Sequence, residues 1–335
     1  MSSHPILLIG GSGVVGRQTA RHLRAAHPDI RLLIGGRDPA RAEEAAREVG
    51  NAEGVVVDLA AADLGLGDRP VGAVAVFFND DRTAGLRFAQ DRGVAYVNIA
   101  PLINEIGPEV AAFMDRPEAA PVVLGTEWLV GATTLPALEF ARAFARLDEI
   151  AIGAVLDDED TGGPAQLVDL ERLTRTAPAA LARRDGVWEW RVGTEAAGKV
   201  RSVDGTAMEA TALSPHDVVG LANATGAPSI SFHLATGETS SRRRGEAKST
   251  EIVIELAGED HAGRPHRSRH AVVHPEGQFP LTGFGVAQVL ERLLGLDGDP
   301  PTPAGLYFPY QLLDPTTYLA RLEAMGGQVL TLDAG

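Results

Sequence analysis

A glycine-rich turn directly after an apolar run constrains the fold of this chain more than any other feature. The run Pro5–Gly10 reads PILLIG, which is typical of a buried strand, and the glycines that follow it have the spacing GxGxxG. In that spacing the first glycine permits a tight turn, the second lets the backbone approach a pyrophosphate, and the third lets a helix pack closely on the sheet. A helix predicted over residues 13–26 presents free N–H groups and partial positive charge at the turn. The turn is therefore predicted to bind dinucleotide phosphates, through Gly11, Ser12, Gly13, Val14, Val15 and Gly16.

Up to about residue 125 the chain alternates short apolar runs with helical stretches rich in Ala, Arg and Glu. Strands are predicted over residues 5–10, 31–35, 55–58, 71–78, 94–99 and 121–125. Strands that are apolar throughout and separated by helices are typical of a parallel sheet covered on both faces. We therefore expect an α/β fold whose first part is a doubly wound Rossmann domain.

The end of the second predicted strand bears on the choice between the two nicotinamide cofactors. An NAD site usually carries Asp or Glu there to accept a hydrogen bond from the ribose 2′-hydroxyl, whereas this chain reads Gly35-Gly36-Arg37-Asp38. Gly36 leaves room for a 2′-phosphate, and the guanidinium of Arg37 matches its geometry. Asp38 is predicted to cap the next helix, which begins with a proline. We expect NADP in preference to NAD; the alternative is that Arg37 is a surface residue that contacts neither cofactor.

Two further polar residues follow predicted strands at the edge where the cofactor crosses such a sheet. Asp58 ends the third strand, where it either accepts a hydrogen bond from the adenine amino group or caps the turn. Asn79 follows the fourth strand and is predicted to contact the cofactor. Asp80, next to it, is expected to cap the helix over residues 82–90.

The pattern changes near residue 149. Strands are predicted over 150–157, 187–192, 200–203, 206–213, 228–235, 249–257 and 267–274, and several alternate apolar with polar residues, as in a mixed or antiparallel sheet with one wet face. Helices are predicted over 164–184, broken near Pro178, and after Ser214, where the sequence SPHD supplies a cap, a proline and an acid. Further helices are predicted over 284–294 and 316–325. The second part is thus expected to be an α+β domain.

Composition excludes several classes of function. Thirty basic and 45 acidic residues give a formal net charge of −15, which disfavours nucleic-acid binding, and without cysteine there is no disulfide, thiolate catalysis or cysteine-based metal site. The N-terminal sequence lacks the pattern of a signal peptide, and no run of about 18 apolar residues occurs, so we expect a cytoplasmic protein without a membrane span. We expect a small-molecule substrate as its partner. Antiparallel sheets with exposed edges often pair across a two-fold axis, so a homodimer is also expected.

Several stretches resemble the saccharopine dehydrogenase-like oxidoreductases, over roughly residues 5–140 and 280–327. The stretches are ILLIGGSGVVGRQTARHL, LLIGGRDPARAEEAA, VVVDL, VAVFFNDD, VLGTEWLVGATTLPALEFAR and the tail TGFGVAQVLERLLG…PAGLYFPYQLLDPTTYLARLEAMGG. The resemblance implies a dinucleotide-binding domain over residues 1–128, a substrate and dimerisation domain over 129–280, and C-terminal helices over 281–335 that pack back on the first domain. It also implies reduction of an imine formed from an amino group and an oxo acid, or the reverse oxidation.

This chain departs from the family pattern at two points. Val130-Gly131 stands where Pro-Gly is common in the family. No clear pair of arginines is placed to bind the carboxylates of an amino-acid substrate. The resemblance therefore does not imply saccharopine itself as the substrate.

Candidates for the catalytic groups lie on three predicted elements. Glu127 follows the sixth strand and is either the general acid or a helix-leading acid, and Trp128 either forms a wall of the substrate pocket or packs in the core. Tyr96 and Asn98 lie on the fifth strand, where a tyrosine either donates a hydrogen bond or packs. His233 shares the polar face of an alternating strand with Ser229 and Ser231, and it acts as a proton donor if that face borders a cleft.

Two remaining groups were considered as ligand sites. Arg243, in the basic run Arg242–Arg244, either binds a substrate carboxylate or lies in a solvated turn. The histidines at positions 261, 266, 270 and 274 fall in a predicted strand, where residues four apart lie about 13 Å from each other, so no metal site is expected. The sequence thus predicts an NADP-dependent oxidoreductase that transfers a hydride to a C=N or C=O bond. The alternatives are a C=C reductase on the same scaffold and a cofactor-binding sensor without turnover.

Overall fold

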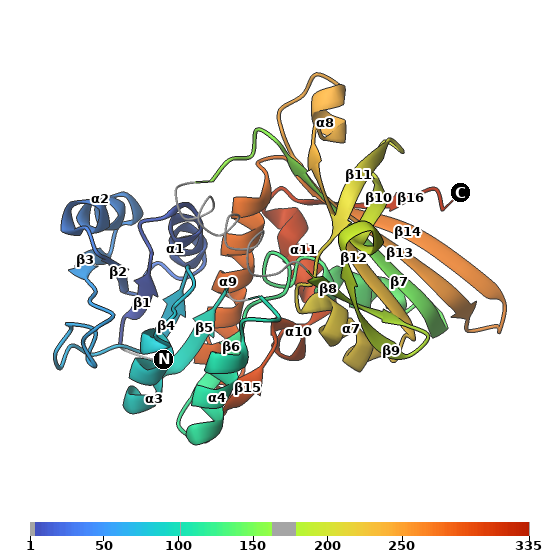
Figure 1. Ribbon diagram of the computed structural model, residues 1–335. Helices are drawn as coiled ribbons and strands as arrows, with labels where there is room; N and C mark the ends of the chain where they lie inside the picture. The colour runs from blue at the N-terminus through green and yellow to red at the C-terminus, as the bar shows by residue number, and fades with distance from the viewer. Residues whose placement is uncertain (1–3, 101, 163–178, 335) are drawn as a thin grey trace. The chain divides into compact units, whose positions relative to one another are not determined.

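The computed structural model describes residues 4–100, 102–162 and 179–334 (Figure 1). The chain divides into two compact units. Unit 1 comprises residues 1–126 and 282–313, and unit 2 comprises residues 127–281 and 314–335. The chain therefore passes from one unit to the other three times.

Unit 1 is built on a sheet of seven parallel strands. They are β1 (Ile6–Ile9), β2 (Leu32–Gly36), β3 (Ala52–Val56), β4 (Ala73–Val76), β5 (Ala95–Asn98), β6 (Pro121–Leu124) and β15 (Gly305–Tyr307), in the spatial order β15-β6-β5-β4-β1-β2-β3. The side chains of β1 and β4 are buried throughout, as strands covered on both faces require. The prediction of a doubly wound Rossmann sheet is confirmed.

The helices of unit 1 connect these strands and follow them in the chain. They are α1 (Val14–Ala26), α2 (Pro39–Val49), α3 (Ala84–Arg92), α4 (Gly107–Asp115), most of α9 (Gln278–Leu294) and α10 (Pro309–Leu312). Helix α2 begins where predicted, because the carboxylate of Asp38 accepts hydrogen bonds from the backbone N–H groups of Ala40 and Arg41.

Unit 2 is built on a mixed sheet of nine strands. They are β7 (Phe144–Asp157), β8 (Ala179–Arg184), β9 (Val187–Val192), β10 (Ala197–Arg201), β11 (Ala207–Ala212), β12 (Ser229–Gly237), β13 (Thr250–Asp260), β14 (Pro265–His274) and β16 (Gln328–Leu332). The main path runs β10-β11-β12-β7-β13-β14-β16, while β8 pairs with β12 and with β9. Only the pair β12–β7 is parallel, so the predicted mixed sheet is confirmed.

Three helices of unit 2 pack on one another. Helix α5 (Thr134–Ala141) contacts both α7 (Asp217–Thr225) and α11 (Pro315–Ala324), and α7 contacts β12. Ile230 and Phe232 of β12 are buried, as the alternating pattern of this strand predicted. The short helix α8 (Ser240–Arg243) and the 3₁₀ turn Gly193–Ala196 complete the unit.

The structure differs from the sequence prediction in three places. Residues 179–184 form strand β8 instead of the end of a helix, because they pair with β9; the rest of that predicted helix, residues 164–178, lies outside the described residues. The predicted C-terminal segment 281–335 is shared between the units, because β16 pairs with β14 of unit 2. Helices α4, α5, α8 and α10 and strands β15 and β16 were not predicted.

Candidate functional site

The glycine turn between β1 and α1 has the geometry that its sequence predicted. Gly10 adopts a φ of +87°, and the N–H of Gly11 donates to the carbonyl of Leu8 at 3.0 Å, which closes the turn. A Cβ atom on Gly11 would lie 2.7 Å from that same oxygen, and one on Gly16 would lie 2.5 Å from the Cα atom of Gly11. These two positions therefore exclude every side chain, and α1 can lie close against the end of β1 only because both are glycine.

The N-terminus of α1 is open where a phosphate would bind. Gly13 and Val14 are exposed, Gly13 is the N-cap, and no side chain caps the helix. The first turn of α1 also carries no acidic residue. Backbone N–H groups at such a helix end are available to an anion, and the helix dipole favours negative charge there. The residues present thus fit a dinucleotide pyrophosphate.

The end of β2 lies beside this turn. A Cβ on Gly36 would meet only the Oγ of Ser12, at 3.7 Å, so space is left between them. Arg37 is exposed and forms no hydrogen bond or ion pair with any described residue. Asp38 is committed to capping α2. An arginine without a partner therefore stands where an NAD site usually carries an acid.

Of the two predicted cofactor contacts that follow strands, Asn79 lies at the same edge of the sheet as the glycine turn, whereas Asp58 caps a turn of its own. Asn79 follows β4, whose neighbour is β1, so it lies at the same edge of the sheet as the glycine turn. The N–H of Phe77 donates to the carbonyl of Ile9, and Phe78 lies against Gly10, which joins the two ends. Asp58 lies two residues beyond β3 and accepts a hydrogen bond from the N–H of Ala60, so it caps a turn, one of its two predicted roles.

Tyr96, predicted as a catalytic group, is instead a buried structural residue. Its side chain is fully buried, and its hydroxyl donates to Glu109 Oε1 at 2.8 Å. Asn98 donates to the same oxygen, also at 2.8 Å, so both β5 side chains attach α4 to the sheet. Burial raises the pKa of Tyr96 well above its usual value and also raises the pKa of Glu109. The full burial of Tyr96 and its hydrogen bond to Glu109 are typical of a structural residue and give no support to the predicted catalytic role.

Glu127 and Trp128 begin unit 2, three and four residues after β6 ends. Glu127 is only 3% exposed, and its backbone carbonyl accepts a hydrogen bond from Val130 in a tight turn. Leu129 and Val130 adopt φ values of +50° and +57°, and Gly131 follows at +94°. Left-handed backbone at bulky and β-branched residues is uncommon and costs free energy, on the order of 1–3 kcal/mol each.

Asp217 fixes this strained turn. Its carboxylate is fully buried and accepts hydrogen bonds from the backbone N–H of Trp128 at 2.6 Å, from the hydroxyl of Thr134 at 2.7 Å and from the hydroxyl of Thr133. Burial raises its pKa to about 6. The sequence predicted Asp217 to complete the N-terminal cap of α7; instead it is the first residue of that helix and turns inward.

Two more titratable groups of unit 2 are buried. His216 is 1% exposed, and burial lowers its pKa to about 4. Burial raises the pKa of Tyr318 in α11, and the negative charges of Glu127 and Asp217 raise it further. Glu127, Asp217 and Tyr318 thus gather at the start of unit 2, and His216 is the buried neighbour of Asp217 in the sequence. Sequence reasoning selected only Glu127, because Asp217 and Tyr318 reach it through the packing of α7 and α11.

Trp128 makes the core contact that was one of its two predicted alternatives. Its ring packs on Phe232 with centroids 5.5 Å apart, which is a core contact. Its indole N–H, however, is buried and has no acceptor among the described residues. A buried donor of this kind needs a partner, which a bound molecule can supply.

His233 does not have the setting predicted for a proton donor. It faces Gly153 across the β12–β7 pair, and β10 crosses this face of the sheet. A Cβ on Gly198 of β10 would lie 2.5 Å from the imidazole ring, so the two are in close contact. Burial and then the positive charge of Arg191 lower the pKa of His233. A ring packed this closely against β10 gives no support to the predicted role of proton donor.

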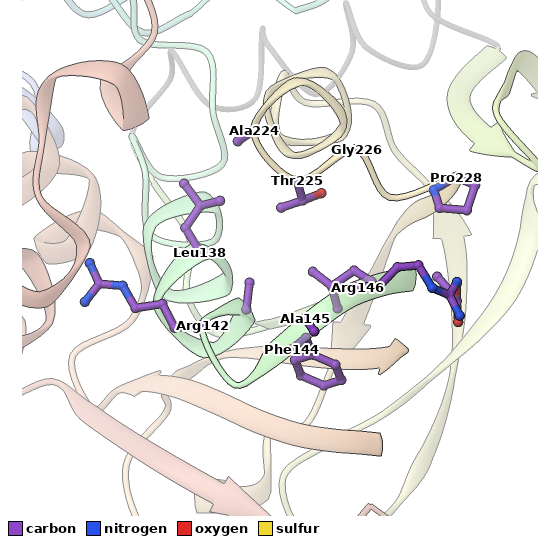
Figure 2. Close-up of a pocket in the computed structure, with 12 residues that line it drawn as sticks. Leu138, Arg142, Phe144, Ala145, Arg146, Ala224, Thr225, Gly226 and Pro228 are labelled. Carbon is purple, nitrogen blue, oxygen red and sulfur yellow. The ribbon is translucent and has the colours of Figure 1, made fainter. Parts of the chain in front are cut away.

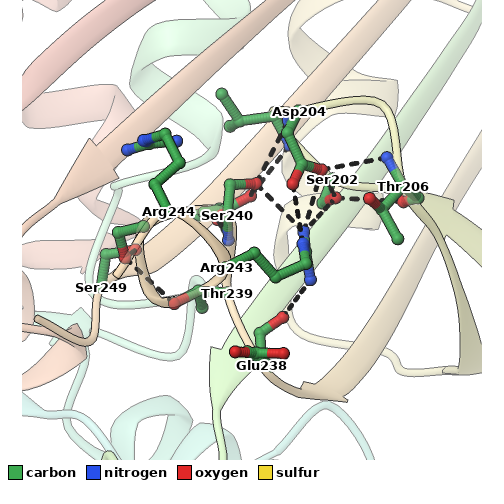
Figure 3. Close-up of polar contacts among 12 residues, drawn as sticks. Ser202, Asp204, Thr206, Glu238, Thr239, Ser240, Arg243, Arg244 and Ser249 are labelled. Atoms are coloured by element: carbon green, nitrogen blue, oxygen red, sulfur yellow. Dashed lines mark hydrogen bonds and ion pairs between the residues drawn. The ribbon is translucent and has the colours of Figure 1, made fainter. Parts of the chain in front are cut away.

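Arg243 was predicted to bind a substrate carboxylate, but its guanidinium donates hydrogen bonds to residues of unit 2 (Figure 3). Its Nε donates to Asp204 at 2.7 Å, and its terminal nitrogens donate to Ser202, Ser240 and the carbonyl of Glu238. The Arg243 guanidinium holds the pKa of Asp204 well below its usual range. This network ties α8 to the β10–β11 turn, and the substrate-binding prediction for Arg243 has no support in it.

A separate open pocket of about 630 Å³ lies at the far end of α5 (Figure 2). Its lining includes Leu138 of α5, Arg142 directly after α5, Phe144 and Arg146 of β7, and Thr225 of α7. Arg142 pairs with Glu139, and Arg146 pairs with Asp148 and Glu259. Helix α5 is about 12 Å long, and Thr134 of the Asp217 cluster stands at its other end. This pocket is therefore distinct from the cluster.

Two classes of site have no candidate in the described part of the chain. No group of three or more His, Cys, Asp or Glu side chains there is arranged to hold a metal ion. No described helix has both the length and the apolar character that crossing a membrane requires.

The chain is similar in fold to several solved structures. No protein-family model matches the sequence, and it matches no curated protein. Saccharopine dehydrogenase (L-Glu forming) from Saccharomyces cerevisiae has a TM-score of 0.65 at 16% identity, with 99% of this chain and 100% of that chain covered. Homospermidine synthase from Legionella pneumophila, in complex with NAD, has a TM-score of 0.63 at 10% identity over 98% and 92% of the two chains.

A third similar structure is the amine dehydrogenase from Mycobacterium smegmatis. Its TM-score is 0.52 at 14% identity, and the match covers 93% of this chain and 96% of that one. The resemblance predicted from the sequence is thus confirmed at the level of the fold. This chain has the fold of saccharopine dehydrogenase, in which a Rossmann-like parallel sheet is joined to a second, mixed sheet.

Proposed function

We propose that this protein is an NADP-dependent oxidoreductase that transfers a hydride to the C=N or C=O bond of a small substrate. The observation that carries the proposal is the glycine turn, whose open helix end lies beside Gly36 and precedes an arginine without a partner. An anion at the helix end and a second anion near Arg37 are the two recognition features of NADP in this fold. The dinucleotide supplies the hydride when it is bound.

The comparisons support the reaction class. Of the three similar structures described above, two carry the name dehydrogenase, one of them for an amine, and the third was solved with NAD. An amine and an imine differ by one hydride and one proton, which favours a C=N substrate. Sequence identities of 10–16% are too low to transfer a particular substrate.

The cluster at the start of unit 2 provides candidate groups for substrate contact and proton supply. We assign Trp128 as a substrate contact, because its buried indole N–H has no acceptor among the described residues. Glu127 is the proton source in this proposal, because its buried carboxyl follows β6, and ligands in such folds bind beyond the carboxyl ends of the strands. Asp217 is a positioning residue that holds the turn carrying both side chains.

Titration with NADPH and NADH, followed by nicotinamide fluorescence, tests the cofactor assignment. Arg37→Ala should weaken NADPH binding at least about 10-fold and change NADH binding little, because only NADPH carries the 2′-phosphate. Arg47→Ala is the matched control, since Arg47 is also exposed but lies in the last turn of α2. Equal weakening of both cofactors by Arg37→Ala, or tighter binding of NADH to the wild type, would contradict the assignment.

Turnover is tested on the same preparation. We expect NADPH oxidation with imines or ketones, and Glu127→Gln should remove turnover while leaving NADPH binding unchanged. If NADPH binds but neither C=N, C=O nor C=C substrates are reduced, the sensor alternative replaces the enzyme. If neither cofactor binds, the glycine turn has a structural role only, and the proposal is wrong.

A further inference from the structure

Strand β9 has an open edge. In the described part of the chain it pairs with β8 alone, and β8 in turn pairs with β12. Most proteins protect such an edge with a proline, a lysine or a bulge, because its backbone groups can pair with another strand. The sequence of β9 is Val-Trp-Glu-Trp-Arg-Val, which contains no proline and no lysine, and its two charges, Glu189 and Arg191, are of opposite sign.

The outer face of β9 is also apolar. Val187, Trp188, Trp190 and Val192 are between 42% and 66% exposed, and they make up four of the seven large apolar side chains that are exposed in the described residues. Trp188, Trp190 and Val192 alternate along the strand and so share one face, while Val187, Glu189 and Arg191 lie on the other. An exposed apolar stripe on an open edge is typical of a protein interface.

The charges on β9 favour pairing with a second β9 strand in one particular register. If two β9 strands pair antiparallel with Trp190 opposite Trp190, then Glu189 of each strand faces Arg191 of the other, and Trp188 faces Val192. Centring the pair on Glu189 or on Arg191 places like charges opposite each other, which is unfavourable. If the register of the two strands shifts by one residue, the tryptophans of one strand lie on the same side of the ribbon as the charged residues of the other.

We propose that β9 pairs antiparallel with β9 of a second copy of this chain, centred on Trp190, and that this edge-to-edge pairing forms a homodimer. The two-fold axis then passes through the Trp190 pair, and the β8–β9 hairpins of both copies join in one continuous ribbon. The contact is isologous, because each copy contributes the same strand. The proposal is independent of the cofactor and the substrate.

Charge reversal on β9 tests the register, with mass measured by light scattering after size exclusion. We expect the wild type at twice the 35.2 kDa of one chain. Glu189→Arg and Arg191→Glu should each weaken the dimer at least about 10-fold, because two attractive pairs become repulsive. A mixture of the two variants should recover the dimer, because every charged pair between the unlike chains is then attractive.

The matched control is Arg184→Glu. Arg184 on β8 forms an ion pair with Glu189 at 3.2 Å within one chain, so this variant loses the same intrachain pair and keeps the edge of β9 intact. It should remain dimeric, and circular dichroism with urea unfolding checks that every variant folds. A monomeric wild type would overturn the proposal, as would single variants that stay dimeric, since the other free edges of the sheet are β10 and β16. A variant mixture that stays monomeric would overturn the register.

Discussion

At the scale of single residues, the buried groups of unit 2 have opposite effects on how stability depends on pH. Asp217 binds its proton more tightly in the folded chain than in the unfolded chain, since its pKa rises from 3.8 to about 6. Its contribution therefore falls as the pH rises from about 4 to about 6. His216 binds its proton less tightly when folded, since its pKa falls from 6.5 to about 4, so its contribution rises with pH over nearly the same window.

We predict that these two contributions largely cancel between pH 4 and 6.5 in the wild type. Asp217→Asn removes one of them, so the free energy of unfolding should then increase with pH by up to about 3 kcal/mol across this window. His216→Gln should reverse that slope. Urea unfolding at several pH values measures both slopes, and the control is the slope of the wild type. Equal slopes in all three proteins would show that these groups do not titrate as their burial implies.

At the scale of elements, the approach of α1 to β1 depends on Gly16. A methyl group there would lie within 3 Å of the backbone of Gly10 and Gly11, so the helix would have to move. We predict that Gly16→Ala destabilises the fold by about 1–3 kcal/mol and weakens NADPH binding. Gly36→Ala is the control, because its methyl group meets nothing closer than 3.7 Å, and its stability should change by less than about 0.5 kcal/mol. Urea unfolding compares the two, and equal effects would contradict the close packing at Gly16.

The elements also show where sequence reasoning succeeds and where it stops. Most of unit 1 was predictable, because strands β1, β2, β4 and β6 are apolar and because local signals mark helix starts, as Asp38 and Pro39 do for α2. Strand β8 was not, because its alanines and arginines favour a helix and only pairing with β9 makes it a strand. The same limit applies to the candidate site. The turn at Gly11 could be predicted from neighbouring residues, whereas the hydrogen bond from Trp128 to Asp217 joins residues 89 positions apart.

At the scale of the whole molecule, the chain couples its two units covalently. It crosses between them near residues 126, 281 and 313, and the middle crossing falls inside helix α9. Unfolding one unit must therefore disrupt a helix that begins in the other. All three tryptophans, Trp128, Trp188 and Trp190, lie in unit 2, so tryptophan fluorescence reports on unit 2 alone.

This distribution makes the coupling measurable. The glycine turn is in unit 1, so NADPH at 100 times its Kd should stabilise that unit by about 2.7 kcal/mol. No tryptophan is near the turn in sequence. If the units nevertheless unfold together, NADPH should raise the urea midpoint measured by tryptophan fluorescence as much as the midpoint measured by far-ultraviolet circular dichroism. We predict this common shift. A control titration with adenosine should leave both midpoints unchanged, because adenosine lacks the phosphates that the helix end binds. A shift confined to circular dichroism would show instead that unit 1 unfolds independently of unit 2.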